Sequence, residues 1–189
     1  MASLDDDQKL IHPARLAYDS IEDFIQAFVD DELIIYDDSE ALFVPERLIA
    51  GGTGLRCRFN PQIGEGVTDI FRPFPGILLL IVDSTRHDTA ARNKLIAEQA
   101  LSMDQFFYAM LVDRGSMKLR FGSAEHRLKE GSGLFYTYRS PQIDEAFVEV
   151  SDGCRFVHIF MTQNGIVNAS SRLGIPIPKA VNALKRDLP

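Results

Sequence analysis

The sequence is poor in the features that mark metal-binding, disulfide-stabilised and nucleic-acid-binding proteins. It has two cysteines, Cys57 and Cys154, which stand far apart and lack the spacing of a zinc site. We therefore expect two buried thiols and no disulfide. There are 20 lysines and arginines against 27 acidic residues, for a net charge of −7, and no stretch is dense in basic residues. Because clustered positive charge provides affinity for phosphates, this chain alone is not expected to bind nucleic acid.

Signals for export, membrane insertion and repetition are also missing. The N-terminus, MASLDDDQKL, is acidic where a signal peptide would be basic and then apolar. No apolar run reaches the about 20 residues of a membrane-spanning helix. We therefore expect a cytoplasmic protein that does not bind membranes. The 189 residues contain no repeats, low-complexity tracts or Ser/Gly linkers, and they suit one domain with a single core.

Motifs for metal, nucleophilic and phosphate chemistry are absent too. The four histidines are His12, His87, His126 and His158. None of them forms a His-x-His pair, so neither a metal nor another cofactor is expected. There is no Gly-x-Ser-x-Gly motif, and Gly51–Gly54 is not followed by the lysine of a P-loop. On one strand Cys154 and His158 would stand about 13 Å apart, too far for a thiolate pair. No catalytic residue is predicted.

The first half of the chain predicts one helix and several strands. Apolar residues recur at helical spacing between Asp19 and Asp31, behind Ser20 as the N-cap. The short apolar segments LIIYDD, ALFVPE and LRCRF are separated by turn residues and predict strands. Between Asp69 and Asp83 a Pro-Phe-Pro-Gly turn precedes an aliphatic run, which predicts a strand buried on both faces. Residues 88–103 fit a helix and an extended loop equally well.

Strand signals become regular after Asp104. Short turns, most of them containing glycine, separate QFFYAMLVD, SMKLRFG, AEHRL, LFYTY, AFVEV and CRFVHIFM. In SMKLRFG, Met117, Leu119 and Phe121 alternate with polar residues, so that one face of the strand would lie in the core. Such closely spaced strands predict a meander within a sandwich or a barrel.

Two helices are expected at the end of the sequence. Residues 164–173 suit a helix that stops at Gly174, because glycine followed by Ile175 and Pro176 is a common C-terminal signal. Pro178 then stands where a second helix would begin.

A set of polar and aromatic residues on the predicted strands forms the candidate site. The predicted ligand-binding residues are Arg120, Tyr136, Tyr138 and His158. A few polar groups among aromatic ones would orient a small molecule inside a barrel. The alternative is that the tyrosines are core or rim residues and that Arg120 is a solvated charge on the outer face. A register error of one residue exchanges the two faces of a strand, so the residues alone leave this open.

The order of these signals resembles a known family. The segments FRPFPGILLLIVD, QFFYAMLVDRGSMKLRFGSAEHRLKEGSGLFYTY and DGCRFVHIFM, with their spaced Gly115, Gly131 and Gly133, are similar to the N-terminal effector-binding domain of AraC-type transcription regulators. The resemblance covers roughly residues 70–173. It implies a mainly β, cupin-like β-barrel or jelly roll with an N-terminal helix and C-terminal helices. It also implies a small-molecule effector and a homodimer.

The resemblance also implies a division of the chain. Residues 1–45 would be a helical segment and arm, 46–163 a cupin-like ligand-binding barrel, and 164–189 dimerisation or linker helices. In this family two helix-turn-helix units follow the barrel, and nothing in these 189 residues encodes them. Either the C-terminal helices lead into such a domain in a longer protein, or the chain is a stand-alone relative. The short helix predicted after Pro178 favours the first.

Two other functions fit the same residues. The first is a stand-alone, metal-free cupin-like enzyme of isomerase or decarboxylase type, with His158, Glu149 and Tyr136 as acid–base groups. The second is an interaction module without a pocket, which would associate through apolar helix faces at Ile166, Val167 and Leu173.

Overall fold

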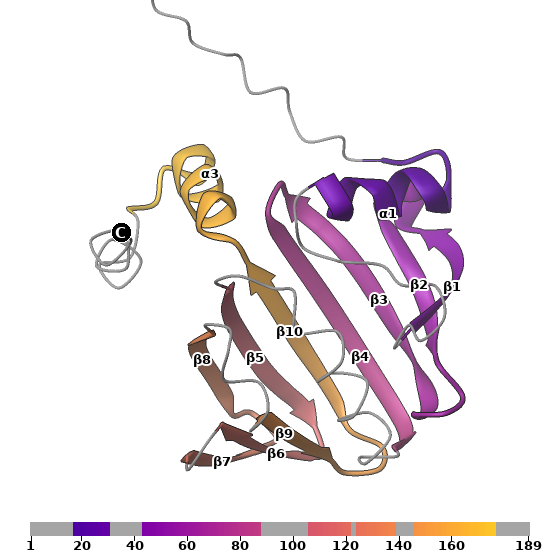
Figure 1. Cartoon of the computed structure of the whole chain (residues 1–189), viewed down its shortest axis with the longest axis vertical. Helices are drawn as coiled ribbons and strands as arrows, with labels where there is room; N and C mark the ends of the chain where they lie inside the picture. The colour runs from indigo at the N-terminus through magenta and orange to yellow at the C-terminus, as the bar shows by residue number, and fades with distance from the viewer. Residues whose placement is uncertain (1–16, 31–42, 88–105, 122–123, 139–145, 177–189) are drawn as a thin grey trace, which may run out of the picture.

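The computed structural model describes residues 17–30, 43–87, 106–121, 124–138 and 146–176. In these ranges the chain forms two antiparallel β-sheets, with one helix before the strands and one after them (Figure 1). Neither of these two helices is long and apolar enough to cross a membrane. The elements are α1 (Ile21–Asp30), β1 (Phe43–Ile49), a 3-10 turn (Ala50–Gly52), β2 (Gly54–Phe59), β3 (Gly64–Phe74), β4 (Ile77–His87), β5 (Phe106–Arg114), β6 (Ser116–Phe121), β7 (Ala124–Lys129), β8 (Gly133–Tyr138), β9 (Ala146–Val150), β10 (Arg155–Met161) and α3 (Gln163–Leu173).

The large sheet has seven strands in the order β1-β2-β3-β4-β10-β5-β8, and the small sheet has three in the order β7-β6-β9. All of their pairings are antiparallel. The last strand, β10, lies between β4 and β5, so segments far apart in the sequence complete the large sheet. The expected mainly β jelly roll with flanking helices is confirmed, as an open sandwich whose sheets do not close into a barrel.

The pairing of the later strands corrects the expected meander. The positions of these strands are as predicted, but β5 pairs with β8 and β10, while β6 pairs with β7 and β9 in the other sheet. The chain changes sheet at Gly115, whose φ of 83° few other residues adopt readily. A Cβ at Gly115 would lie 2.9 Å from Ser151 Oγ and 3.0 Å from Cys154 Cα. Turn residues show where a strand ends, but not which sheet the next strand joins.

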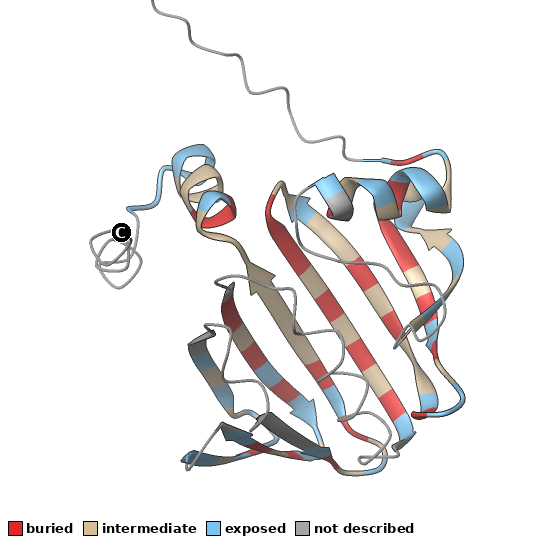
Figure 2. Cartoon of the chain, viewed as in Figure 1, coloured by how far each residue is buried: buried red, intermediate tan, exposed pale blue. Residues whose placement is uncertain are grey.

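The core lies between the two sheets and beneath α1. Along β4, Leu78, Leu80 and Val82 are buried, while Leu79 and Ile81 between them are half-buried, an alternation that Figure 2 shows as bands. The prediction that this strand is buried on both faces therefore holds for one face. The core cluster consists of Tyr18, Phe24, Phe28, Leu55, Cys57, Phe59, Ile63, Ile70, Leu78, Leu80, Val82, Tyr108, Met110, Val112, Met117, Leu119, Leu128, Val150, Cys154 and Phe156.

Helix α1 covers the core at the β1–β2 side of the large sheet. Phe24 and Phe28, one helical turn apart, are fully buried, and their rings meet edge to face at a centroid distance of 5.0 Å. The predicted cap is confirmed, because the Asp23 backbone N–H donates to Ser20 Oγ at 3.0 Å. The segment LIIYDD and residues 88–103 lie outside the described residues.

Helix α3 packs on the outer face of the large sheet. The Thr162 backbone N–H donates to the carbonyl of Gly76 at 2.8 Å, and the Thr162 hydroxyl accepts from the Gly165 N–H at 3.0 Å, which caps the helix. Ile166 is buried against Phe107 of β5, with Met161 beside them. The helix ends at Gly174, with a φ of 63°, as the sequence predicts. The helix expected from Pro178 lies outside the described residues.

We predict that Gly165→Ala weakens the docking of α3 on the sheet. The new Cβ would collide with the carbonyl group of Gly76 in the β3–β4 turn. Overpacking of this kind costs about 1–3 kcal/mol, which chemical denaturation would measure as a lower free energy of unfolding. Asn164→Ala, at an exposed position of the same helix, is the matched control. Equal stability of the two variants would contradict the close packing of Gly76 and Gly165.

Candidate functional site

His158 lies at the centre of the large sheet, with its side chain between the sheets. It belongs to β10, where it pairs with Leu80 of β4 and Met110 of β5. Cys154 and Phe156, on the same face of the strand, are buried in the core. The Nε2 atom of His158 is itself buried. The side chain of His158 thus lies on the inner face of β10, and its role in ligand binding stays a prediction.

Two aromatic side chains surround the imidazole. The ring of His158 lies 4.0 Å from that of Phe160 and 5.5 Å from that of Tyr108, measured between centroids. Tyr108 and Phe160 meet edge to face at 4.8 Å. We call these three residues the aromatic cluster. Tyr108 was absent from the predicted site, although its alternation with Met110 and Val112 in QFFYAMLVD was a signal for this face.

The two predicted tyrosines belong to the strand next to the aromatic cluster. In the register of β5 and β8, Tyr136 pairs with Tyr108, and Tyr138 pairs with Phe106. The positions of their side chains lie outside what the structure describes. Their role as ligand-binding residues stays a prediction.

Arg120 does not project into the interior. It is exposed, and its neighbour Leu119 is fully buried, so Arg120 occupies the outer face of β6. It pairs in register with Glu125 of β7 and Phe147 of β9. The alternative reading, a charge on the outer face, agrees with this position. The alternation in SMKLRFG, which places Leu119 on the core face, already favours this outer position for Arg120.

The interior face is apolar with a few neutral polar groups. The described residues of the core cluster include no lysine, arginine, aspartate or glutamate. Thr68 of β3 is fully buried, and its hydroxyl oxygen has no hydrogen-bond partner in the structure. Together with His158 and the Tyr108 hydroxyl, this gives an apolar surface with few hydrogen-bonding atoms, a composition typical of sites for small organic molecules. No three possible metal ligands come together among the described residues.

A hollow with mostly polar lining residues lies beside α1. It has a volume of about 330 Å³ and is lined by Tyr18, Asp23, Gln26, Ala27, Asp30 and Arg72. Arg72 Nη1 donates to the Tyr18 hydroxyl at 3.1 Å, which ties β3 to the start of the helical segment. This hollow could not be predicted from the sequence, because its residues come from segments whose proximity depends on the packing of α1.

The two cysteines are buried free thiols, as predicted. Burial in apolar surroundings raises the pKa of Cys57 to about 12, with a smaller contribution from the negative charges of Asp69 and Glu46. Burial likewise raises the pKa of Cys154. Both thiols therefore keep their protons at neutral pH, and neither is an activated nucleophile.

The two sheets and their strand order define a jelly-roll-like β-sandwich. No family model matches the sequence, and no curated protein matches it either. Similar solved structures include FeII HppE (10% identity, TM-score 0.41, 68% of this chain and 64% of that chain). Others are a cupin-2 domain containing protein from Shewanella frigidimarina (10%, 0.31, 50% and 79%) and the AraC-like transcriptional activator CuxR (10%, 0.38, 68% and 42%). The chain thus spans less than two thirds of HppE and less than half of CuxR. Likenesses this distant carry no argument about what the chain binds.

We predict that iodoacetamide does not alkylate either native cysteine in the folded protein at about pH 8, because alkylation requires an accessible thiolate. Both should react once the chain is unfolded, which mass spectrometry would detect. Arg127→Cys, at a side chain that is 79% exposed, provides a reactive control thiol. If Cys57 reacted as fast in the folded protein as this control, it would not be buried as described.

Proposed function

We propose that the chain is a small-molecule-binding domain of the effector-sensing type found in AraC-like transcription regulators, and that it acts as a homodimer. One observation carries this proposal: the imidazole of His158 lies between the sheets against Tyr108 and Phe160. A neutral imidazole donates one hydrogen bond and accepts another, so it can orient a ligand that the surrounding rings hold by apolar contact. Arg120, on the outer face, is not part of the proposed site.

The connection between β10 and α3 supports a sensing role. Four residues, from Ile159 to Thr162, separate His158 from the first residue of the helix. Phe160 of the aromatic cluster is one of them. Thr162 caps the helix through its hydroxyl and donates its backbone N–H to the carbonyl of Gly76 in the β3–β4 turn. A ligand that binds one arrangement of β10 more tightly would therefore favour one placement of α3. Such a shift is how an effector site would affect a domain beyond the helix.

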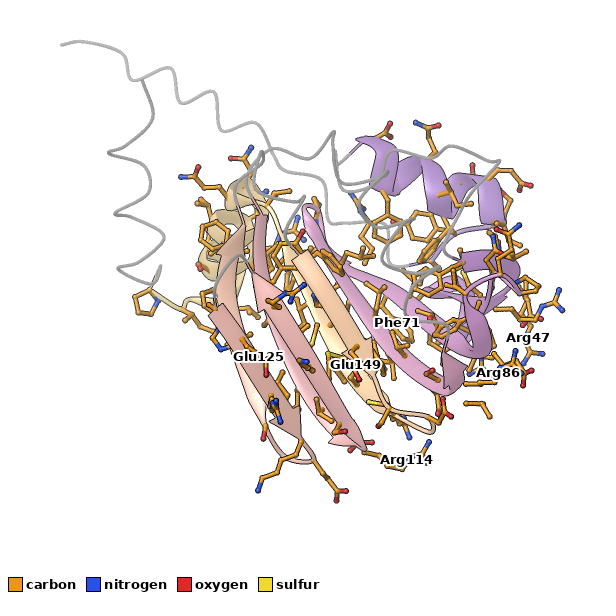
Figure 3. The ribbon with its side chains drawn as sticks, turned by 60° about the horizontal axis from the view of Figure 1, so that its bottom comes forward. Arg47, Phe71, Arg86, Arg114, Glu125 and Glu149 are labelled. Atoms are coloured by element: carbon orange, nitrogen blue, oxygen red, sulfur yellow. The ribbon has the colours of Figure 1, made fainter. Side chains whose placement is uncertain are left out.

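One of the three acid–base groups of the enzyme alternative, Glu149, lies outside the interior. Glu149 is exposed on β9 and forms an ion pair with Lys118 at 3.8 Å, on the outer face of the small sheet. Figure 3 shows Glu125 and Glu149, both partners of that lysine. His158 faces the interior, so these two groups do not share a site. The remaining distinction is chemical: an enzyme converts its ligand, whereas a sensor returns it unchanged.

We predict that neutral aromatic compounds bind this domain and that His158→Phe weakens their binding. A panel of phenols and indoles, with charged analogues beside them, would be screened by thermal shift and the Kd of each hit measured by calorimetry. Loss of a ligand hydrogen bond of about 1–2 kcal/mol would raise the Kd roughly 5- to 30-fold. Phenylalanine preserves the aromatic packing, and Arg120→Ala is the matched control that should leave the Kd unchanged.

Two outcomes would count against the proposal. If no compound of the panel shifts the melting temperature, or if His158→Phe and Arg120→Ala affect the Kd equally, the aromatic cluster is not a ligand site. Mass analysis of each hit after incubation with the protein separates the sensor from the enzyme, because conversion of the compound would favour the enzyme.

A further inference from the structure

The outer face of the large sheet carries an uninterrupted row of apolar side chains. The register joins Phe71 to Leu79, Leu79 to Ile159, Ile159 to Ala109 and Ala109 to Phe135, so the row crosses five strands. All five residues lie on the face opposite the core, because their neighbours along β3, β4, β10 and β5 point inward. Phe135 is 55% exposed, and the others are partly exposed.

A second apolar row lies beside the first. Ile81 pairs with Val157, and Val157 pairs with Leu111, which is 49% exposed. Together the two rows form a surface that we call the apolar outer face. An antiparallel sheet with one face toward water normally alternates apolar and polar residues. Strands β4, β10 and β5 are instead apolar on both faces, a pattern typical of strands that are covered on both sides.

Polar ion pairs occupy neighbouring outer positions on β2, β3 and the small sheet, as expected for contact with water. On β2 and β3, Arg56 and Asp69 form a two-point ion pair with distances of 2.7 Å. On the small sheet, Lys118 lies 3.5 Å from Glu125. The apolar outer face is therefore a local departure from the pattern of the molecule and not a general property of its strands.

The chain covers one end of this face itself. Ile166 of α3 is buried against Phe107, which lies one row beyond Ala109 on the same side of β5, with Met161 next to it. Phe107 is 3% exposed beneath the helix, whereas Leu111 on the same strand is 49% exposed. The apolar surface thus continues past the edge of α3.

The opposite end of the face is charged but locally neutral. Asp83 accepts from Arg114 Nη2 at 2.9 Å, and Arg155 lies 3.6 Å from Asp113. Figure 3 labels Arg114 at the end of the large sheet. Two positive and two negative side chains sit here, while the whole chain carries −7. A surface with alternating positive and negative side chains can face a copy of itself, with each cation opposite an anion. Two copies that meet here would experience little of the repulsion that their net charges cause elsewhere.

We propose that a second copy of this chain docks on the apolar outer face, with the two large sheets packed face to face about a two-fold axis. The dimer itself is part of the proposed function, and the inference here is its interface. Strand spacing and rise give the two rows a footprint on the order of 20 Å by 13 Å, or about 250 Å². A standard interface buries about 800 Å² on each partner. The apolar rows would therefore be its centre and the charged row part of its polar rim.

Sedimentation equilibrium of the whole chain and of single-residue variants tests this interface. We expect a wild-type dimer, and we expect both Leu111→Glu and Leu111→Lys to raise the dimer dissociation constant at least 100-fold, because either charge would be buried without a partner. The two variants change the net charge of the chain in opposite directions. An effect common to both is therefore due to burial of a charge and not to the change in net charge. Val44→Glu, at an apolar position of β1 that is 38% exposed, is the matched control and should dimerise like the wild type.

Three results would overturn the proposal. They are a monomeric wild-type chain, an unchanged dimer in both Leu111 variants, and dissociation caused by Leu173→Glu at the exposed end of α3 but not by the Leu111 variants. The last result would assign the dimer to the helix. Circular dichroism must show that each variant is folded. Ligand binding is measured separately on the same variants. A wrong interface would then be distinguished from a wrong sensing function, because the ligand would still bind in the first case.

Discussion

The structure depends on the insertion of β10 between β4 and β5. These two strands are neighbours in sequence order but do not pair with each other, and β10 supplies the partner for both. Without it the large sheet would separate into a β1–β4 part and a β5–β8 part, and the core between the sheets would lose Cys154 and Phe156. Pairing of this kind is non-local, so the energy of the fold rests on contacts that form only when the whole chain is in place.

The same strand carries the chemistry and its connection to the rest of the molecule. His158 sits at the middle of β10, where neighbouring strands on both sides hold the backbone in register. Helix α3 begins directly after the strand, and Thr162 joins that helix to the Gly76 turn. In the proposed function, a central strand that ends at a docked helix is a short path between the ligand and the outer surface. The inner face of the strand carries the proposed ligand site, and its outer face, with Val157 and Ile159, belongs to the apolar outer face.

The buried faces of β6 in the small sheet and β4 in the large sheet differ in how clearly the sequence marks them. Along β6, alternation identifies Met117 and Leu119 as core residues, and both are buried. Along β4 the aliphatic run has no alternation, so the sequence predicted burial on both faces. The structure buries Leu80 and leaves Ile81 half-exposed. If a second chain covers that face, the continuous run and the partial exposure have one explanation, since a strand at a dimer interface needs apolar residues on both sides.

The sequence by itself determined the positions of most described strands, both helices with their caps at Ser20 and Gly174, and the burial of the two thiols. These features depend on local signals: period-two alternation, capping residues, and glycine at positive φ. Only the tertiary structure decided that β6, β7 and β9 form a separate sheet and that Tyr108 joins His158. Each of these depends on which strands pair and in which register. Side chains alternate along every strand, so the choice between inside and outside is made by the partner strand and not by the residue itself.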